Sequence, residues 1–389
     1  MKIIRQAKIY APEFLGKKDV LVAGGKIQKI QDNIVLEGNV DIDEIEAQDM
    51  IMFPGFIDSH VHITGGGGEG SFSSRTPEIM LSDITSAGVT TVIGTLGTDG
   101  TTRTMTNLLA KARGLEEEGI TTFVNTGSYQ IPVKTITGSI TDDIILIEKI
   151  IGVGEIAISD HRSSQPSFED IAKLIADARL GGMLSGKAGT VNFHLGDSKR
   201  MLDILFEVAE KTEIPLKHIV PTHTNRNPYL FEDAIKYAKM GGYIDFTTST
   251  VPQFIEEGEV ECWKALKRVF EEGIDMQNIT FSSDAQGSLP RFDQNGTMIG
   301  IDVGKVSSLY EAVISCIKNG EISIEKAIMT ITSNPARIYK LKGKGFIKEG
   351  MDADIVLVEE DTLKIKSVMA NGRFMISNEE ILIKGTFEK

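Results

Sequence analysis

The sequence predicts an α/β protein, a (β/α)8 TIM barrel with a small β-sandwich domain built from both termini. Eight short apolar segments alternate with helical stretches in the middle of the chain, and both ends contain strand–turn–strand patterns. A chain of 389 residues is long enough for one large domain and a smaller one. We expect a small β domain over 1–53 plus 342–389 and a barrel domain over 54–341.

The ends of the chain have the pattern of β-hairpins. Near the N-terminus, DVLVAGGKIQKI predicts two strands joined at Gly24–Gly25. Near the C-terminus, ADIVLV is followed by KSVMANGRFMI, in which Asn371–Gly372 is a two-residue hairpin signal. Each end is too short to be stable alone, so we expect the two to form one domain.

Eight segments of the middle region have the short, β-branched character of buried strands. They are FIDSHVH (56–62), TTVIGTL (90–96), TTFVNTG (121–127), GEIAIS (154–159), TVNFHLG (190–196), HIVPTHT (218–224), GYIDFTTS (242–249) and ITFSSDA (279–285). Between them, SFEDIAKLIADARLGG has a Ser167/Asp170 capping pair, and PYLFEDAIKYAKMGG places Phe231 and Ile235 on one face. An open doubly wound sheet is the alternative, but the GGGG run lacks the GxGxxG spacing of a dinucleotide site.

Charge and cysteine content limit the class of protein. A net charge of −14 disfavours nucleic acid and anionic membranes as partners, because both would repel the chain. The only two cysteines, Cys262 and Cys316, fall in separate predicted helices and are expected as core residues. The N-terminus lacks the apolar core of a signal peptide and no run approaches transmembrane length, so we expect a cytoplasmic protein.

The histidines are concentrated at the predicted strand ends. In FIDSHVHITGGGGEG, alternation places Asp58, His60 and His62 on one face of the first strand. Four of the six histidines follow this rule at the ends where barrel enzymes have their active sites, with one carboxylate on the fourth strand and one on the eighth. The predicted ligands are His60, His62, Glu155, His194, His223 and Asp284.

Six such ligands exceed the three that one catalytic zinc takes from a protein. They suit two divalent metals about 3.5–4 Å apart, and imidazole with carboxylate but no thiolate suits zinc. The other two histidines, His161 in the loop after the fourth strand and His218 before the sixth, are expected to be structural.

The motif order resembles the amidohydrolase superfamily, and within it the isoaspartyl dipeptidases. PGFID before HVH, GGGGEG, SRTPE, LGTDG, TGSITDD, ISDHRSS, FHLGDSK, PTHTNRN and SSDAQGS are similar to that family along nearly the whole chain. The resemblance implies a metallo-dipeptidase, a metalloprotease that hydrolyses the isopeptide bond of β-aspartyl dipeptides with a hydroxide activated by two metals. It also implies a homo-oligomer, often an octamer.

The resemblance carries roles to individual residues. Asp284 is implied as the proton carrier, and Tyr129 as the group that stabilises the oxyanion. Substrate contacts are implied for Gly67, Glu69, Thr98, Tyr129, Arg162, Arg226 and Ser288. Glu69 would pair with the substrate ammonium, and the two arginines with its carboxylates.

Glu155 departs from the family pattern, which has a carboxylated lysine at this position. Both groups present an anionic carboxyl, so we expect Glu155 to bridge the metals without carbon dioxide. Two rival functions remain: a cyclic-amide hydrolase of the dihydroorotase or hydantoinase type, which would not need the Glu69 ammonium anchor, and a non-catalytic scaffold, which would be expected to have lost metal ligands.

Overall fold

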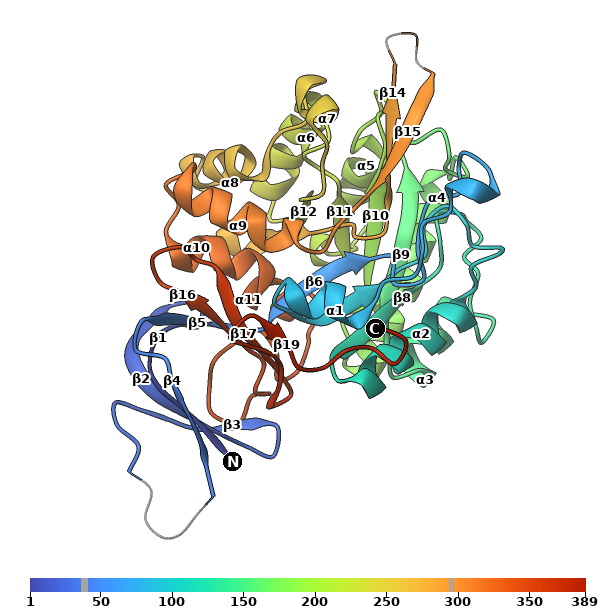
Figure 1. Ribbon diagram of the computed structural model, residues 1–389. Coiled ribbons are helices and arrows are strands. Elements are labelled where there is room, and N and C mark those ends of the chain that lie inside the picture. Colours follow the sequence, from blue (N-terminus) through green and yellow to red (C-terminus); the bar gives the residue numbers. More distant parts are fainter. Residues whose placement is uncertain (36–40, 294, 296) are drawn as a thin grey trace.

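The computed structural model describes residues 1–35, 41–293, 295 and 297–389. It is a mixed α/β structure, as predicted, with a β-rich part beside a larger part in which strands and helices alternate (Figure 1). Within this described part of the chain, every helix is too short or too polar to span a lipid bilayer.

The β-rich part is one nine-stranded sheet to which both ends of the chain contribute. Its strands are β1 (Lys2–Tyr10), β2 (Phe14–Ala23), β3 (Lys26–Gln31), β4 (Asp43–Glu46), β5 (Met50–Pro54), β16 (Ile355–Glu359), β17 (Ile365–Ala370), β18 (Arg373–Ser377) and β19 (Glu380–Ile381). The predicted turns Gly24–Gly25 and Asn371–Gly372 join β2 to β3 and β17 to β18. β5 lies between β1 and β16, so strands from opposite ends of the sequence are neighbours.

The sheet has its own apolar core, and aromatic side chains join it to the larger part. Ile4, Ile27, Met52 and Leu357 belong to a cluster of fully buried side chains within the sheet. At the junction, Phe56 stacks on Tyr310 with ring centroids 4.8 Å apart, and Phe53 meets the edge of the same ring. Aromatic contacts of this kind favour a fixed junction between the two parts.

The larger part contains all eight predicted strands. They are β6 (Phe56–Val61), β7 (Val89–Gly94), β8 (Thr121–Thr126), β9 (Ile150–Ile158), β10 (Thr190–Leu195), β11 (Ile219–Thr222), β12 (Ile244–Thr247) and β13 (Ile279–Ser282). β6 to β11 form a six-stranded parallel sheet in sequence order, and β12 pairs with β13. β13 approaches β6 through a bridge between Val61 and Ala285, supported by the bond from His62 N to Ala285 O.

Helices follow the strands and cover them from outside (Figure 1). They are α1 (Leu81–Ser86), α2 (Met105–Glu118), α3 (Ile140–Leu146), α4 (Phe168–Ser185), α5 (Asp203–Lys211), α6 (Pro228–Lys239), α7 (Pro252–Glu256), α8 (Cys262–Glu271), α9 (Ser308–Lys318), α10 (Ile324–Ile328) and α11 (Ser333–Ile338). The Ser167/Asp170 capping pair begins α4 as predicted. Both cysteines are buried and free, in α8 and α9.

One hairpin was not predicted from the sequence. β14 (Ser288–Phe292) and β15 (Met298–Val303) pair antiparallel immediately after the Asp284 turn and project from the top of the molecule (Figure 1). The pattern of this segment is weak because Pro290 interrupts it and polar residues occupy the turn. The hairpin therefore adds a wall above the strand ends.

Candidate active site

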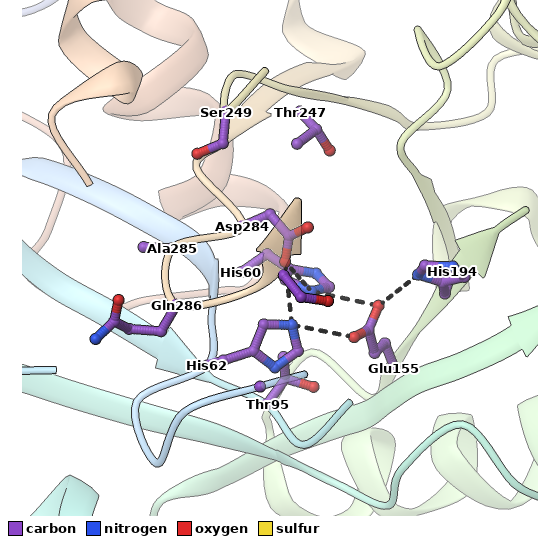
Figure 2. Close-up of polar contacts among 12 residues, drawn as sticks. His60, His62, Thr95, Glu155, His194, Thr247, Ser249, Asp284, Ala285 and Gln286 are labelled. Atoms are coloured by element: carbon purple, nitrogen blue, oxygen red, sulfur yellow. Dashed lines mark hydrogen bonds and ion pairs between the residues drawn. The ribbon is translucent and has the colours of Figure 1, made fainter. Parts of the chain in front are cut away.

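A cavity of about 640 Å³ lies at the carboxyl ends of the parallel strands. Residues from the ends of β6, β9, β10, β11 and β13 turn their side chains toward one another there, and Figure 2 shows His60, His62, Glu155, His194 and Asp284 around one space. All seven predicted substrate contacts line the same cavity. The structure therefore brings together all the predicted site residues.

Glu155 lies at the centre of the imidazole cluster. Its Oε2 is 3.4 Å from His60 Nε2, 3.0 Å from His194 Nδ1 and 3.6 Å from His223 Nε2. Its Oε1 is 3.3 Å from His62 Nε2. The carboxylate is fully buried on β9. Four imidazoles from three different strands therefore surround one acidic side chain that has no access to solvent.

Asp284 completes the cluster from the opposite side. Its Oδ1 lies 3.0 Å from His62 Nε2 and 3.7 Å from His60 Nε2 (Figure 2). Asp284 and His223 have φ angles of 52° and 62°, in the left-handed region that non-glycine residues rarely adopt. Each follows its strand within two residues, and the unusual backbone turns the side chain into the cavity rather than along the strand.

The charges of this cluster depend on one another. Burial alone would raise the pKa of Glu155, but His60 and His194 hold it well below its ordinary value. Burial would lower the pKa of His60, yet Glu155 and Asp284 raise it to about 9. Burial and the neighbouring His194 lower the pKa of His223 to about 3, so this imidazole is neutral and has a free lone pair near neutral pH.

The polar atoms of the cluster are arranged better for binding metal cations than for hydrogen bonding to one another. Several of its buried atoms lack a hydrogen-bond partner among the described residues; they are His60 Nε2, His62 Nδ1, Glu155 Oε1, His223 Nε2 and Asp284 Oδ1. Buried polar atoms are otherwise almost always paired. Two groups have ligand atoms within 4.8 Å of one another, His60–His62–Glu155 and Glu155–His194–His223. Because Glu155 belongs to both, two cation positions sharing this carboxylate fit the donor set.

The glycine run shapes the loop that carries Glu69. Gly65 and Gly67 have φ angles of +80° and +66°, and a Cβ at either would lie 2.3 Å from Thr76 O or 2.6 Å from Ser74 O. A side chain would therefore clash with the returning backbone. Beyond the run, Glu69 Oε1 accepts a bond from Thr98 Oγ1 at 2.7 Å, and Ser288 Oγ lies 3.4 Å from Oε2. The glycines thus bring Glu69 to the cavity.

Arg162 also lines the cavity and contacts Glu69. Its Nη1 donates to Glu69 Oε1 at 3.3 Å, and its Nε and Nη2 donate to Asp160 at 3.0 and 2.7 Å. Opposite charges are therefore presented together, an acceptor for an ammonium group and a donor for a carboxylate. Burial would raise the pKa of Asp160, but hydrogen bonds from His194 and Arg162 hold it well below its usual range.

Tyr129 contacts both Arg162 and the imidazole cluster. The phenol oxygen is 2.9 Å from His194 Nδ1, and the Arg162 guanidinium lies over the ring, 5.3 Å from its centroid. Burial, reinforced by the negative charge of Glu155, raises the pKa of Tyr129 well above its ordinary value. The hydroxyl therefore keeps its proton and is available as a donor beside the cluster.

Arg226 is a second cationic side chain in the lining of the cavity. Its side chain has no hydrogen bond or ion pair among the described residues, whereas its backbone N bonds to His223 O. The wall beside it comes from the segment after β12, with Phe254, Glu257 and Glu259. Asn225 anchors that segment by donating to Val260 O and accepting from its backbone N. This part of the lining thus combines an unpaired cation with apolar and acidic side chains.

Sequence reasoning did not identify several residues of the site. Asp160 lies inside the ISDHRSS motif, two positions before Arg162, and that spacing was the available signal. Glu259 and Phe254 carried none, because their segment resembles an ordinary surface helix and turn. The hairpin adds Leu289, Pro290, Met298 and Ile301 to the lining.

The two remaining histidines differ in position. The His161 side chain is 91% exposed and lines the rim of the cavity, 3.6 Å from Asp160. His218 lies away from the cavity, where its Nδ1 is 3.1 Å from Gly189 O. Neither belongs to the buried cluster.

Known structures align with this chain over almost its whole length. A β-aspartyl dipeptidase of Fervidobacterium islandicum AW-1 in complex with β-Asp-Leu has a TM-score of 0.91 and 48% identity, covering 98% of this chain and 97% of that one. A second structure of the enzyme from that organism has a TM-score of 0.88 and 46% identity, covering 98% of both chains. A D-hydantoinase structure shares the fold at a TM-score of 0.70 and 17% identity, covering 100% of this chain and 98% of that one.

Curated sequences give a more distant match. A dihydroorotase of Clostridium acetobutylicum is 25% identical over 400 residues, covering 89% of this chain and 86% of its own length. The model of the amidohydrolase family matches residues 51–375, which include every member of the buried cluster. Five strand ends that deliver imidazole and carboxylate to one cavity agree with that match, and the chain belongs to the amidohydrolase family.

Proposed function

We propose that this protein is a metal-dependent β-aspartyl dipeptidase, which hydrolyses the isopeptide bond between a β-linked aspartyl residue and the amino acid that follows it. The observation that carries this proposal is the set of groups that line one cavity. They are the Glu69–Arg162 pair, the imidazole cluster and the unpaired Arg226. The likeness to the Fervidobacterium islandicum enzyme bound to β-Asp-Leu supports it.

A β-aspartyl dipeptide has charges that match these groups. Its free α-ammonium fits the Glu69 carboxylate, with Gly67, Thr98 and Ser288 completing that wall. Its aspartyl α-carboxylate fits Arg162, and the carboxylate of the leaving residue fits Arg226. The scissile amide between them is then held beside the imidazole cluster.

The residues of the cluster are proposed to hold two divalent cations, with zinc as the expected metal. His60, His62 and Asp284 would hold one, His194 and His223 the other, and Glu155 would bridge them as a glutamate in place of a carboxylated lysine. When bound, such a pair acidifies a water molecule and polarises the amide carbonyl.

Two side chains carry the proton and charge changes of the reaction. Asp284, at the edge of the cluster, accepts the proton of the attacking water and delivers it to the leaving amine nitrogen. The Tyr129 hydroxyl, which keeps its proton, donates a hydrogen bond to the oxygen that becomes negative during the attack.

The remaining parts of the proposal concern the whole chain. We propose that β6 to β13 close a (β/α)8 barrel over 54–341, and that the nine-stranded sheet is a small β-sandwich domain over 1–53 plus 342–389. The family resemblance supports a homo-oligomer, an octamer in related enzymes. The acidic composition and the two free, buried cysteines support a cytoplasmic protein without nucleic-acid or membrane partners.

A cyclic-amide hydrolase is the second candidate, because dihydroorotase sequences and hydantoinase structures match the chain. Such substrates carry no free α-amine for Glu69 to bind. The deciding experiment is a product-release assay with β-Asp-Leu, α-Asp-Leu and dihydroorotate, with bound metal measured on the same sample. Cleavage of β-Asp-Leu alone supports the dipeptidase, whereas turnover of dihydroorotate alone contradicts it.

A further inference from the structure

Asp160 contacts both Arg162, a proposed substrate anchor, and His194 of the imidazole cluster. Its side chain is 3% exposed, and it belongs to the loop that follows β9. Oδ1 accepts from Arg162 Nε at 3.0 Å, and Oδ2 accepts from Arg162 Nη2 at 2.7 Å, so the guanidinium is held by a two-point contact. This contact fixes the plane of the guanidinium and leaves Nη1 directed at Glu69, 3.3 Å away.

The same carboxylate also contacts the imidazole cluster. Oδ2 lies 3.1 Å from His194 Nε2, while His194 Nδ1 lies 3.0 Å from Glu155 Oε2. An imidazole that uses one nitrogen to bind a cation must carry its proton on the other. Because the Asp160 carboxylate accepts from Nε2, it stabilises the ring orientation in which Nδ1 faces Glu155 and would face a cation held by that carboxylate.

We propose that Asp160 is a positioning residue that orients both Arg162 for the substrate and His194 for the metal. The part of this proposal that concerns substrate binding rests on the proposed function. The part that concerns metal binding depends only on the imidazole cluster. One buried carboxylate would then couple the anchoring of the aspartyl end to the geometry of the metal pair.

A loop-shaping role alone would be met by an asparagine at this position. Oδ1 also accepts from Arg162 backbone N at 2.7 Å, which closes a short turn, and an amide oxygen can accept the same bond. An amide nitrogen in place of Oδ2 cannot accept from Arg162 Nη2 or from His194 Nε2. Asp160→Asn therefore keeps the turn and removes only the contacts on which the proposal rests.

The test measures metal retention and kinetics on the full-length Asp160→Asn protein. Zinc retention against a chelator is expected to weaken 10- to 100-fold, the usual range when a partner of a metal-bound histidine is lost. The visible spectrum of the cobalt-loaded variant should shift as His194 loses its orientation. KM for β-Asp-Leu should rise at least tenfold.

Asp143→Asn is the matched control. Asp143 in α3 is also buried and accepts several bonds, including those from Thr126 Oγ1 and the backbone N of Thr137, but it does not line the cavity. This variant should lower thermal stability while leaving metal retention and KM unchanged. Arg162→Met should raise KM as Asp160→Asn does, but keep metal retention within threefold.

Each outcome decides the proposal. Changes in both metal retention and KM in Asp160→Asn support it, and a change in only one, or in neither beyond twofold, overturns it. Equal effects in Asp143→Asn would reduce the result to loss of stability and also overturn it. If the unmodified protein cleaves no β-aspartyl dipeptide, the proposed function fails, and metal retention with the cobalt spectrum then decides the role of Asp160.

Discussion

Glu155 and His194 contact each other through Oε2 and Nδ1 at 3.0 Å, while the other oxygen of the same carboxylate faces His62 at 3.3 Å. A single side chain on β9 thus reaches the imidazoles of two different strands. A family lysine at this position would need carbon dioxide to present a carboxyl group, whereas glutamate presents one directly. If two cations bind as proposed, both would depend on Glu155.

Replacing Glu155 by alanine should therefore empty both positions. The shared anionic ligand is lost, and four buried imidazoles would be left to hold two cations without a bridging charge. Metal analysis after dialysis is expected to show less than half an equivalent per chain, with activity lost in parallel. Glu259→Gln, which removes a carboxylate from the cavity wall away from the cluster, should retain its metal. Unchanged occupancy in Glu155→Ala would refute bridging.

Tyr129→Phe should lower kcat by about 10²–10³-fold with little change in KM, because a single oxyanion donor contributes mainly to the transition state. The buried ring still packs under the Arg162 guanidinium after this change, so the cavity is expected to keep its shape. Steady-state kinetics with β-Asp-Leu and metal analysis provide the measurement. A kcat close to that of the unmodified enzyme would remove Tyr129 from the mechanism.

Arg226→Met should raise KM for dipeptides by about 10–100-fold, the range expected when a charge-assisted hydrogen bond to a substrate carboxylate is lost. Arg226 has no partner among the described residues, so its removal leaves no buried carboxylate of the protein unpaired. The control is a substrate whose leaving residue is amidated, for which the two proteins should have similar KM values. An unchanged KM for β-Asp-Leu contradicts the anchor assignment.

Glu259 should make the preference for the leaving residue depend on pH. Burial raises its pKa to about 7, against the opposing influence of Thr250 and Arg226. The carboxyl is neutral below that value and ionised above it, so the attraction for a cationic side chain is gained as pH rises. The ratio of kcat/KM for β-Asp-Lys to that for β-Asp-Glu is expected to increase between pH 6 and pH 8.

The ratio compares two substrates at the same pH. Changes in kcat/KM caused by groups that affect both substrates equally therefore cancel. Glu259→Gln should flatten the ratio because the amide has no charge to gain. A ratio that changes equally in this variant would assign the effect to another group of the cavity.

The sequence predicted those features that depend on local pattern. The Ser167 cap, the Gly24–Gly25 and Asn371–Gly372 turns and the eight strands of the larger part are confirmed, with strand boundaries displaced by at most four residues. The histidine positions followed from one rule, that parallel strands present their carboxyl ends to one side. Spacing alone was therefore enough to bring His60, His194 and His223 together.

Other features depend on contacts between distant segments and have no local signal. Asp160 gains its importance from Arg162 and His194, and only folding brings the imidazole to it. The left-handed backbone of Asp284 is likewise set by its surroundings, because an aspartate in isolation disfavours it. The β14–β15 hairpin escaped prediction because its strands are short, partly exposed and interrupted by Pro290.

The place of β5 between β1 and β16 has a consequence for synthesis of the chain. During translation β5 leaves the ribosome long before β16 has been made. Until then, the backbone N–H and C=O groups on the β16 side of β5 have no strand to pair with. An unpaired edge of apolar strand invites association with other chains. Polypeptides released early, before Ile355, are therefore expected to aggregate and require chaperones, even though they carry every histidine of the site.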